Sequence, residues 1–239
     1  MNVKLSSLGW LALLLPVFCV GLAHAASSLS IQDETRGVAG FHALSNSGSI
    51  EVEVRFGSSE SVRLEGDEAA IREIETVVES GTLKIRYKKR SRSGGHNWGK
   101  VIAYVTAKRL DALTQSGSGK IAVTGAISGK ELNIALSGSG RITFESDAEV
   151  CNASISGSGR IVSNGRATES NISISGSGRF DGAELRSQSA NLNISGSGNI
   201  SLHVDKHLAA AISGSGNVSY TGNAETNVRT SGSGRVRKI

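Results

Sequence analysis

Three arginines in the C-terminal half of the chain recur at nearly equal intervals and could bind anions. Arg141, Arg160 and Arg179 each directly follow a Ser-Gly-Ser-Gly motif. The planar guanidinium group donates paired hydrogen bonds to phosphate, sulfate or carboxylate groups. If the segments between the motifs stack as coils, the three arginines lie next to one another. Their like charges then repel unless water, nearby acids or an anionic ligand screens them. The three arginines are therefore candidates for binding an envelope glycan, against the simpler interpretation as solvated surface charges.

A second basic feature is the segment of residues 88–100, which lies between two predicted strands. Its cationic side chains could contact the phosphates of lipid A or the carboxylates of peptidoglycan. An indole ring in the same segment could stack on a sugar. We expect a surface loop, with the candidate contact residues Lys88, Lys89, Arg90, Arg92 and Trp98.

Residues that could bind a metal are few. His203, Asp205 and His207 alternate along the chain, so a strand would bring all three to one face with ligand types that suit zinc. They fall between two predicted coils, where polar residues are expected in any case, and metal binding by them stays an open question. No nucleophile elbow and no Cys/His pairing is visible. We assign no catalytic residue, metal or cofactor.

Carboxylates are the other candidates for catalysis, because polysaccharide-active β-helix enzymes use acids clustered on one side. The acids of the repeat region are predicted to occupy different registers, and they are Glu145, Asp147, Glu149, Glu169, Asp181 and Glu184. This scatter favours a non-catalytic protein over the alternative, a polysaccharide-active enzyme.

An internal repeat must position these side chains. Ser-Gly-Ser-Gly occurs seven times, beginning at Ser116, Ser137, Ser156, Ser175, Ser195, Ser213 and Ser231. The spacing of 18 to 21 residues is the length of one solenoid coil. Such a coil can turn once around a thin core, and stacked coils align equivalent residues. The sequence therefore predicts an all-β fold, a parallel β-helix (solenoid).

Apolar residues recur in three columns with the period of two that strands show. The strictest column follows each motif, at Ile121, Ile142, Ile161, Phe180, Ile200, Val218 and Val236. Two less strict columns precede the motifs, one from Leu136 to Ile212 and one from Leu113 to Val228. Continued through the motif, the alternation points both serines outward and both glycines into the core.

An asparagine lies four residues before five of the motifs, at Asn133, Asn152, Asn171, Asn191 and Asn227. Stacked amides can hydrogen-bond along a ladder, so we interpret this column as structural. The outward serines form two further regular columns, for which an ice-binding surface is an alternative.

The region before the repeats has a different pattern. Residues 67–80 place four apolar side chains on one helical face, which predicts one short amphipathic helix that caps the stack. Residues 46–50 resemble a degenerate motif, so we expect the early strands to follow the coil path already. The segments predicted as strands are 49–56, 61–64, 82–87 and 101–106.

The first 25 residues are typical of a signal peptide. Lys4 supplies the positive charge, residues 8–22 form an apolar run, and Ala23-His24-Ala25 offers a cleavage site. No later segment approaches the roughly 20 apolar residues that a bilayer requires, so we expect no transmembrane segment in the mature chain. Export to the periplasm, the outer surface or the medium argues against nucleic acid as a partner.

Residues 26–239 are predicted to form one domain, with N-terminal coils and the helix in 26–115 and the repeats in 116–239. The formal charge of +5 is compatible with anionic envelope polymers. Cys151 is the only cysteine outside the leader, so no internal disulfide is expected. The sequence leaves the oligomeric state open.

A family resemblance adds to this interpretation. The order of an Ile-Glu-Val-Glu-Val strand, a short helix, Gly-Thr-Leu-Lys-Ile, and then residues 111–119 leading into the repeats resembles the autotransporter adhesin head GIN domain family. The similarity covers nearly the whole mature chain. It implies a β-helical envelope protein without an established activity. An adhesin-like or structural module follows as an expectation, with an envelope glycan, lipopolysaccharide or another surface protein as partner.

Overall fold

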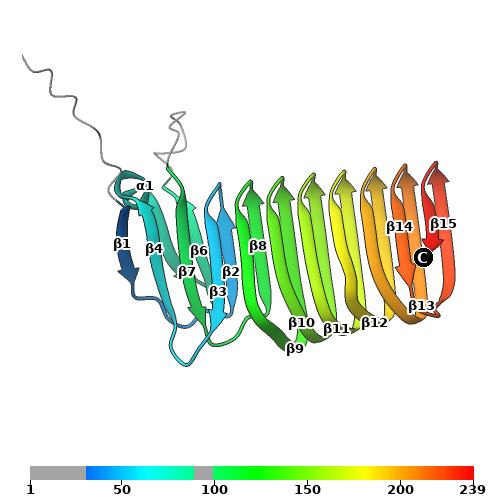
Figure 1. The fold of residues 1–239 in the computed structure, drawn as a ribbon, viewed down its shortest axis with the longest axis horizontal. Coiled ribbons are helices and arrows are strands. Elements are labelled where there is room, and N and C mark those ends of the chain that lie inside the picture. Colours follow the sequence, from blue (N-terminus) through cyan, green and yellow to red (C-terminus); the bar gives the residue numbers. More distant parts are fainter. Residues whose placement is uncertain (1–30, 89–98) are drawn as a thin grey trace, which may run out of the picture.

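The computed structural model describes residues 31–88 and 99–239, which form a parallel β-solenoid of about seven turns. Strands make up nearly all of it, with one short helix at the N-terminal end (Figure 1). The predicted all-β, parallel β-helix class is confirmed. In the described part of the chain, no helix is long and apolar enough to cross a membrane.

The N-terminal elements precede the repeats and are β1 (Ile31–Arg36), β2 (Ala43–Ser47), β3 (Glu51–Phe56), β4 (Ser61–Asp67), α1 (Glu68–Arg72), β5 (Ile74–Glu79), β6 (Thr82–Tyr87), β7 (Val101–Ala107) and β8 (Ala112–Gly117). The repeat elements are β9 (Lys120–Gly138), β10 (Arg141–Gly157), β11 (Arg160–Gly176), β12 (Arg179–Gly196), β13 (Asn199–Gly214), β14 (Asn217–Thr221), β15 (Glu225–Gly232) and β16 (Arg235–Lys238).

The coils of the repeat region stack in sequence order along the long axis of the molecule (Figure 1). All pairings from β9 to β16 are parallel. Equivalent residues of neighbouring coils pair with each other, for example Ser156 with Ser175 and Gly157 with Gly176. The motif period therefore sets the register of the sheet.

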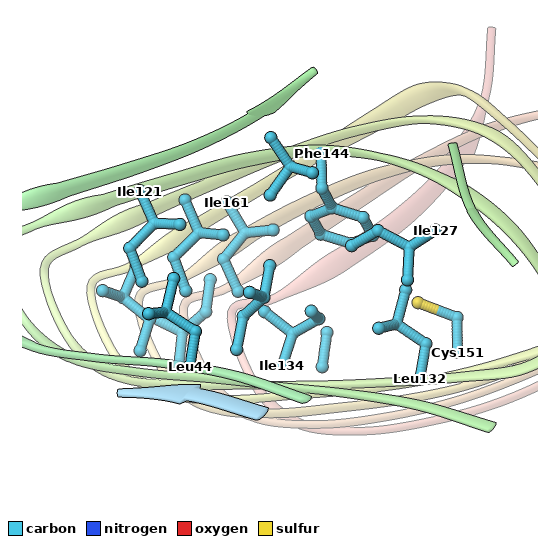
Figure 2. Close-up of a cluster of buried hydrophobic side chains, with 14 of the residues drawn as sticks. Leu44, Ile121, Ile127, Leu132, Ile134, Phe144, Cys151 and Ile161 are labelled. Atoms are coloured by element: carbon cyan, nitrogen blue, oxygen red, sulfur yellow. The ribbon is translucent and has the colours of Figure 1, made fainter. Parts of the chain in front are cut away.

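The predicted apolar columns form the core between the two walls of each coil. Figure 2 shows Ile121, Ile161 and Phe144 on one wall, facing Leu44 and Ile134 on the other. The column that follows each motif is buried from Ile121 to Val218, and only Val236 in the last coil is partly exposed.

Cys151 also lies in this core and is fully buried. Burial raises the pKa of its thiol to about 12. The residue therefore acts as a small apolar side chain of the core.

The two glycines of each motif have different roles, which corrects the prediction that both point into the core. Gly178 is buried, and a Cβ there would lie 2.4 Å from Cγ2 of Ile155. Gly176 is half-exposed at the turn, with a φ of +113°, and a Cβ there would lie 2.7 Å from the carbonyl oxygen of Gly157. The strict alternation ends at this residue because a positive φ turns the chain out of the extended conformation. The motif serines are exposed throughout the repeats, as predicted.

The helix is much shorter than residues 67–80, and the second half of that segment is strand β5. Asp67 begins α1 by accepting a hydrogen bond from the backbone N–H of Ala70. From Ile74 the chain forms an antiparallel hairpin with β6, through a turn in which Ser80 and Gly81 both have positive φ. The β-branched residues of Ile-Glu-Thr-Val-Val favour this strand over a longer helix.

The early strands follow the coil path only in part. The coil of β2 and β3 is parallel to the repeats, but it lies between the β6–β7 pair and β8–β9, out of sequence order. The strands β1, β4 and β5 are outer or connecting strands that pair antiparallel. The prediction of continuous early coils was therefore correct for β2 and β3 and wrong for these three strands.

A buried polar pair marks this inserted coil. The amide nitrogen Nδ2 of Asn46 donates to Oε1 of Gln115 at 2.7 Å and to the carbonyl oxygen of Ile50 at 2.8 Å. These two residues stand in one column, between Ile85 of β6 and the aliphatic residues Leu136 and Ile155 of the repeats. The side-chain oxygen Oδ1 of Asn46 has no partner among the described residues.

Candidate anion-binding site

The structure brings Arg141, Arg160 and Arg179 side by side, and these three residues are called the arginine strip. Each occupies the first position of its strand, in β10, β11 and β12. Arg141 pairs in register with Arg160, and Arg160 with Arg179. Neighbouring strands lie roughly 4.8 Å apart, so the strip spans about 10 Å along the solenoid.

Few carboxylates balance the arginine strip. Nε of Arg160 lies 3.1 Å from Oδ2 of Asp181, which stands two residues past Arg179 in the next coil. Arg141 and Arg179 are exposed, and the side chain of neither forms a hydrogen bond or ion pair with any residue in 31–88 or 99–239. Two of the three guanidinium groups are therefore available to a ligand.

Lys120 extends the same column toward the N-terminal end, because it pairs in register with Arg141. Its Nζ lies 3.0 Å from Oε1 of Glu51, and Nζ of Lys100 lies 3.1 Å from Oε2 of the same carboxylate. The hydrogen bond from Lys120, followed by that from Lys100, holds the pKa of Glu51 below its usual value. Lys120 directly follows the first motif, so its place in the column was readable from the sequence although it was not selected as a site residue.

Exposed hydroxyl groups border the strip on the side of the turn. The second serine of each motif lies two residues before the arginine, as Ser158 does before Arg160 and Ser177 before Arg179. A hydroxyl can donate to an anion that the guanidinium groups hold. The site is an open, shallow surface of donors without a neighbouring cluster of acids.

The asparagine column forms the predicted ladder on the opposite wall. Nδ2 of Asn152 donates to Oδ1 of Asn133 at 3.0 Å, Asn171 donates to Asn152 at 3.1 Å, and Asn191 donates to Asn171 at 2.9 Å. Ala209 interrupts the column before Asn227. These contacts occupy the amides with one another, which supports their structural role.

The basic segment is described only at its start. Lys88 is exposed after β6, and its ammonium group donates to the carbonyl oxygen of Arg72 at the end of α1. Lys88 therefore lies beside α1, at the N-terminal end of the solenoid. Lys89, Arg90, Arg92 and Trp98 lie outside the described residues.

The three candidate metal ligands are engaged with protein partners. Nδ1 of His203 lies 2.8 Å from Oγ1 of Thr221, and its Nε2 lies 2.9 Å from Oδ1 of Asp205. His207 points to Glu225, with 3.9 Å between Nδ1 and Oε2. Across the described ranges, no group of three His, Cys, Asp or Glu side chains is arranged to hold a metal ion.

The sequence predicted that the acids of the repeats occupy different registers, and this prediction is wrong for two of them. Glu145 and Glu184 share one column, with Asn164 between them. The column was missed because the chain between Asp181 and Arg186 shifts register. Asp147 is engaged by Arg166, whose Nε lies 2.6 Å away and holds the pKa of that carboxyl below its usual value.

Comparison with protein families gives one match. The family described as "Putative auto-transporter adhesin, head GIN domain" matches residues 40–224. No match was found among curated proteins.

Several solved structures share the fold. A protein from Bacteroides fragilis described as a putative adhesin superposes with a TM-score of 0.82 at 19% identity, over 89% of this chain and 98% of that one. A protein from Parabacteroides distasonis described as a putative lipid binding protein gives 0.71 at 24% identity, over 87% and 96%. A putative adhesin from Parabacteroides merdae gives 0.70 at 22% identity, over 87% and 96%.

Proposed function

The chain belongs to the head GIN domain family, and we propose that it is an exported, non-catalytic, adhesin-like module that binds anionic envelope glycans. The observation that carries this proposal is the register of Arg141, Arg160 and Arg179 on one exposed column, where Asp181 is the only carboxylate partner among the described residues. Stacking like charges costs free energy in the absence of a ligand, and a polyanion that runs along the solenoid removes this cost.

The ligand class follows from the geometry of the strip. Three guanidinium groups in a row, bordered by serine hydroxyls, suit phosphate, sulfate or carboxylate groups repeated along a polymer. The exposed position suits a long chain that lies across the surface better than a small molecule, which needs a concave site.

Location and further contacts belong to the same proposal. The leader-like first 25 residues support export to the periplasm, the outer surface or the medium. The segment from Lys88, with Lys89, Arg90, Arg92 and Trp98, is a second basic contact in this proposal. One structural relative is described as lipid-binding, so the phosphates of lipopolysaccharide are among the ligands to test.

A binding array tests the proposal. The chain from residue 26 onward would be applied to sulfated, phosphorylated and carboxylated polysaccharides, to lipopolysaccharide and to neutral polysaccharides. We expect binding to an anionic polymer that weakens as salt rises, because charge pairing with a polyanion releases counterions.

Matched variants locate the site. Replacing Arg141, Arg160 and Arg179 together by glutamine should weaken binding about 30-fold or more, since three charge-assisted contacts are lost. The control replaces Arg186, Arg229 and Arg237 by glutamine, which are exposed, carry the same charge and lie outside the strip. Equal losses in the two variants, or no anionic ligand on the array, would refute the proposal.

A further inference from the structure

A groove of about 500 Å³ lies on the outer surface of β4, β7, β3 and β9, near the N-terminal end of the solenoid. In one row across these strands, Tyr104 stands between Arg63 and Glu53. In the next row, Thr106 stands between Ser61 and Arg55. Short hydroxyl side chains beside long charged and aromatic ones leave the surface hollow at this place.

One wall of the groove is held in place by internal contacts. The guanidinium carbon of Arg63 lies 4.2 Å from the ring centroid of Tyr104. Nη1 of Arg63 donates to Oδ2 of Asp33 at 2.7 Å and to Oε2 of Glu65 at 3.1 Å. The charge of Arg63 is therefore compensated, and the half-buried aromatic ring is fixed beside it.

The groove contains a hydrogen-bond acceptor and a hydrogen-bond donor that no described protein group engages fully. Glu53 is exposed, and its carboxylate forms no ion pair or hydrogen bond with any described residue. Arg55 uses Nε on Oγ1 of Thr106 at 3.3 Å, and no acceptor in the described chain engages the rest of its guanidinium group. Hydroxyl groups of Thr35 and Thr124 also line the groove. Acceptors, donors and an aromatic ring thus converge on one hollow.

We propose that this groove binds an uncharged sugar ring. Sugar hydroxyls both donate and accept, so one ring can donate to Glu53 and accept from Arg55. The volume falls within the range of small-ligand sites, about 300 to 1,000 Å³, and the ring of Tyr104 supplies an apolar surface. The free carboxylate of Glu53 repels phosphate and sulfate groups. The groove therefore differs in ligand chemistry from the arginine strip, and this inference goes beyond the proposed function.

Isothermal titration of the chain from residue 26 onward with neutral oligosaccharides of glucose, galactose and N-acetylglucosamine tests the groove. We expect at least one to bind with an affinity that does not change with salt, because no net charge is paired. Glu53→Gln and Tyr104→Ala should each weaken this binding about tenfold. Glu184→Gln, at an exposed acid in the repeats, is the matched control and should bind as the unmodified chain does.

The outcomes separate this site from the arginine strip. Thermal unfolding shows whether Tyr104→Ala is folded, and Glu53→Gln changes only an exposed side chain, so it stays informative in either case. Failure of all neutral sugars to bind, or unchanged binding by Glu53→Gln, would overturn the inference. Neutral-sugar binding that disappears in the triple arginine variant but survives Glu53→Gln would overturn it as well.

Discussion

The repeat region and the N-terminal region build the same solenoid by different means. From β9 onward each coil pairs with its successor in sequence, and every pairing is parallel. Before β9 the chain inserts the β2–β3 coil between two others and adds the antiparallel strands β1, β4 and β5 together with α1 (Figure 1). Coils that repeat one motif present equivalent edges, so they stack directly on one another. An end of the stack needs other elements to cover its edge.

The largest expected difference between the two regions concerns the turn glycines. Gly176 in the repeats and Gly48 in the N-terminal coil both have positive φ. A Cβ at Gly176 would lie 2.7 Å from a backbone oxygen, whereas at Gly48 it would lie 3.1 Å from the side chain of Tyr87, which can shift. We expect Gly176→Ala to lower the free energy of unfolding by about 3 kcal/mol or more and Gly48→Ala by about 1 to 2 kcal/mol.

Urea denaturation of the two variants measures this difference. Gly129→Ala is the control, because a Cβ there meets nothing within 4 Å and its φ is not positive. It should change the free energy of unfolding by less than about 0.5 kcal/mol. Equal losses of unfolding free energy for Gly176→Ala and Gly48→Ala would mean that both positions require glycine because of backbone strain alone. The contact with the stacked neighbour would then add nothing.

The second difference lies in one core column, which is polar at Asn46 and Gln115 and aliphatic in the repeats. Gln115→Leu alone should lower the free energy of unfolding by about 1 to 3 kcal/mol, because it leaves the buried amide of Asn46 without this partner. Replacing both residues by leucine should cost much less than the two single changes added together. A double-mutant cycle by urea denaturation measures the coupling, and strictly additive values would show that the pair is not an energetic unit.

The repeats could be predicted almost residue by residue, because one motif imposes one register on every coil. The inward position of Ile161 and the stacking of Arg141 on Arg160 both follow from the spacing of the motif. The spacing failed at Gly176, which was predicted to point into the core but lies half-exposed at the turn, because period-two alternation holds only while the backbone stays extended and its φ is +113°.

The topology of the N-terminal region could not be predicted from the sequence, for a physical reason. The positions of Ile74 and Val78 fit the apolar face of a helix as well as that of a strand, and the strand forms because β-branched residues favour it and β6 pairs with it. The inserted β2–β3 coil arises from contacts between segments distant in sequence, which a local pattern does not encode. Asp181 was not identified as the partner of Arg160 because their contact is diagonal: in register, Arg160 pairs with Arg179, and Asp181 pairs with Val162.

The third prediction uses a defect within the repeats. The asparagine ladder runs from Asn133 to Asn191 and is broken by Ala209, where a hollow of about 260 Å³ lies between Asn191 and Asn227. Ala209→Asn should raise the free energy of unfolding by about 0.5 to 1 kcal/mol by completing the ladder. Ala183→Asn, at an exposed position that pairs with no neighbouring strand residue, is the control for the change in side chain. A loss of stability for Ala209→Asn in urea denaturation would show that the ladder adds nothing.

The smallest effect is expected where the two regions meet. Glu51 on β3 receives Lys120 from the first repeat coil and Lys100 from the N-terminal region, and both contacts lower its pKa. A lowered pKa in the folded state means that the ionised carboxylate stabilises the fold above its unfolded pKa. This contribution is lost as the pH falls through the folded pKa. Because both ammonium groups are mostly exposed, the contribution is at most about 1 kcal/mol.

Glu51→Gln measures the contribution, since it keeps the shape and removes the charge. The variant should be less stable than the unmodified chain at about pH 7, and the difference should shrink as the pH is lowered, because Glu51 takes up a proton as the pH falls through its lowered folded pKa. Urea denaturation over a series of pH values from about 7 downward, at low and high salt, provides the measurement. A difference that does not change with pH would assign the role of Glu51 to packing rather than charge. The junction between the two regions would then depend on side-chain shape, as the repeats do, and not on the ion pairs that join them.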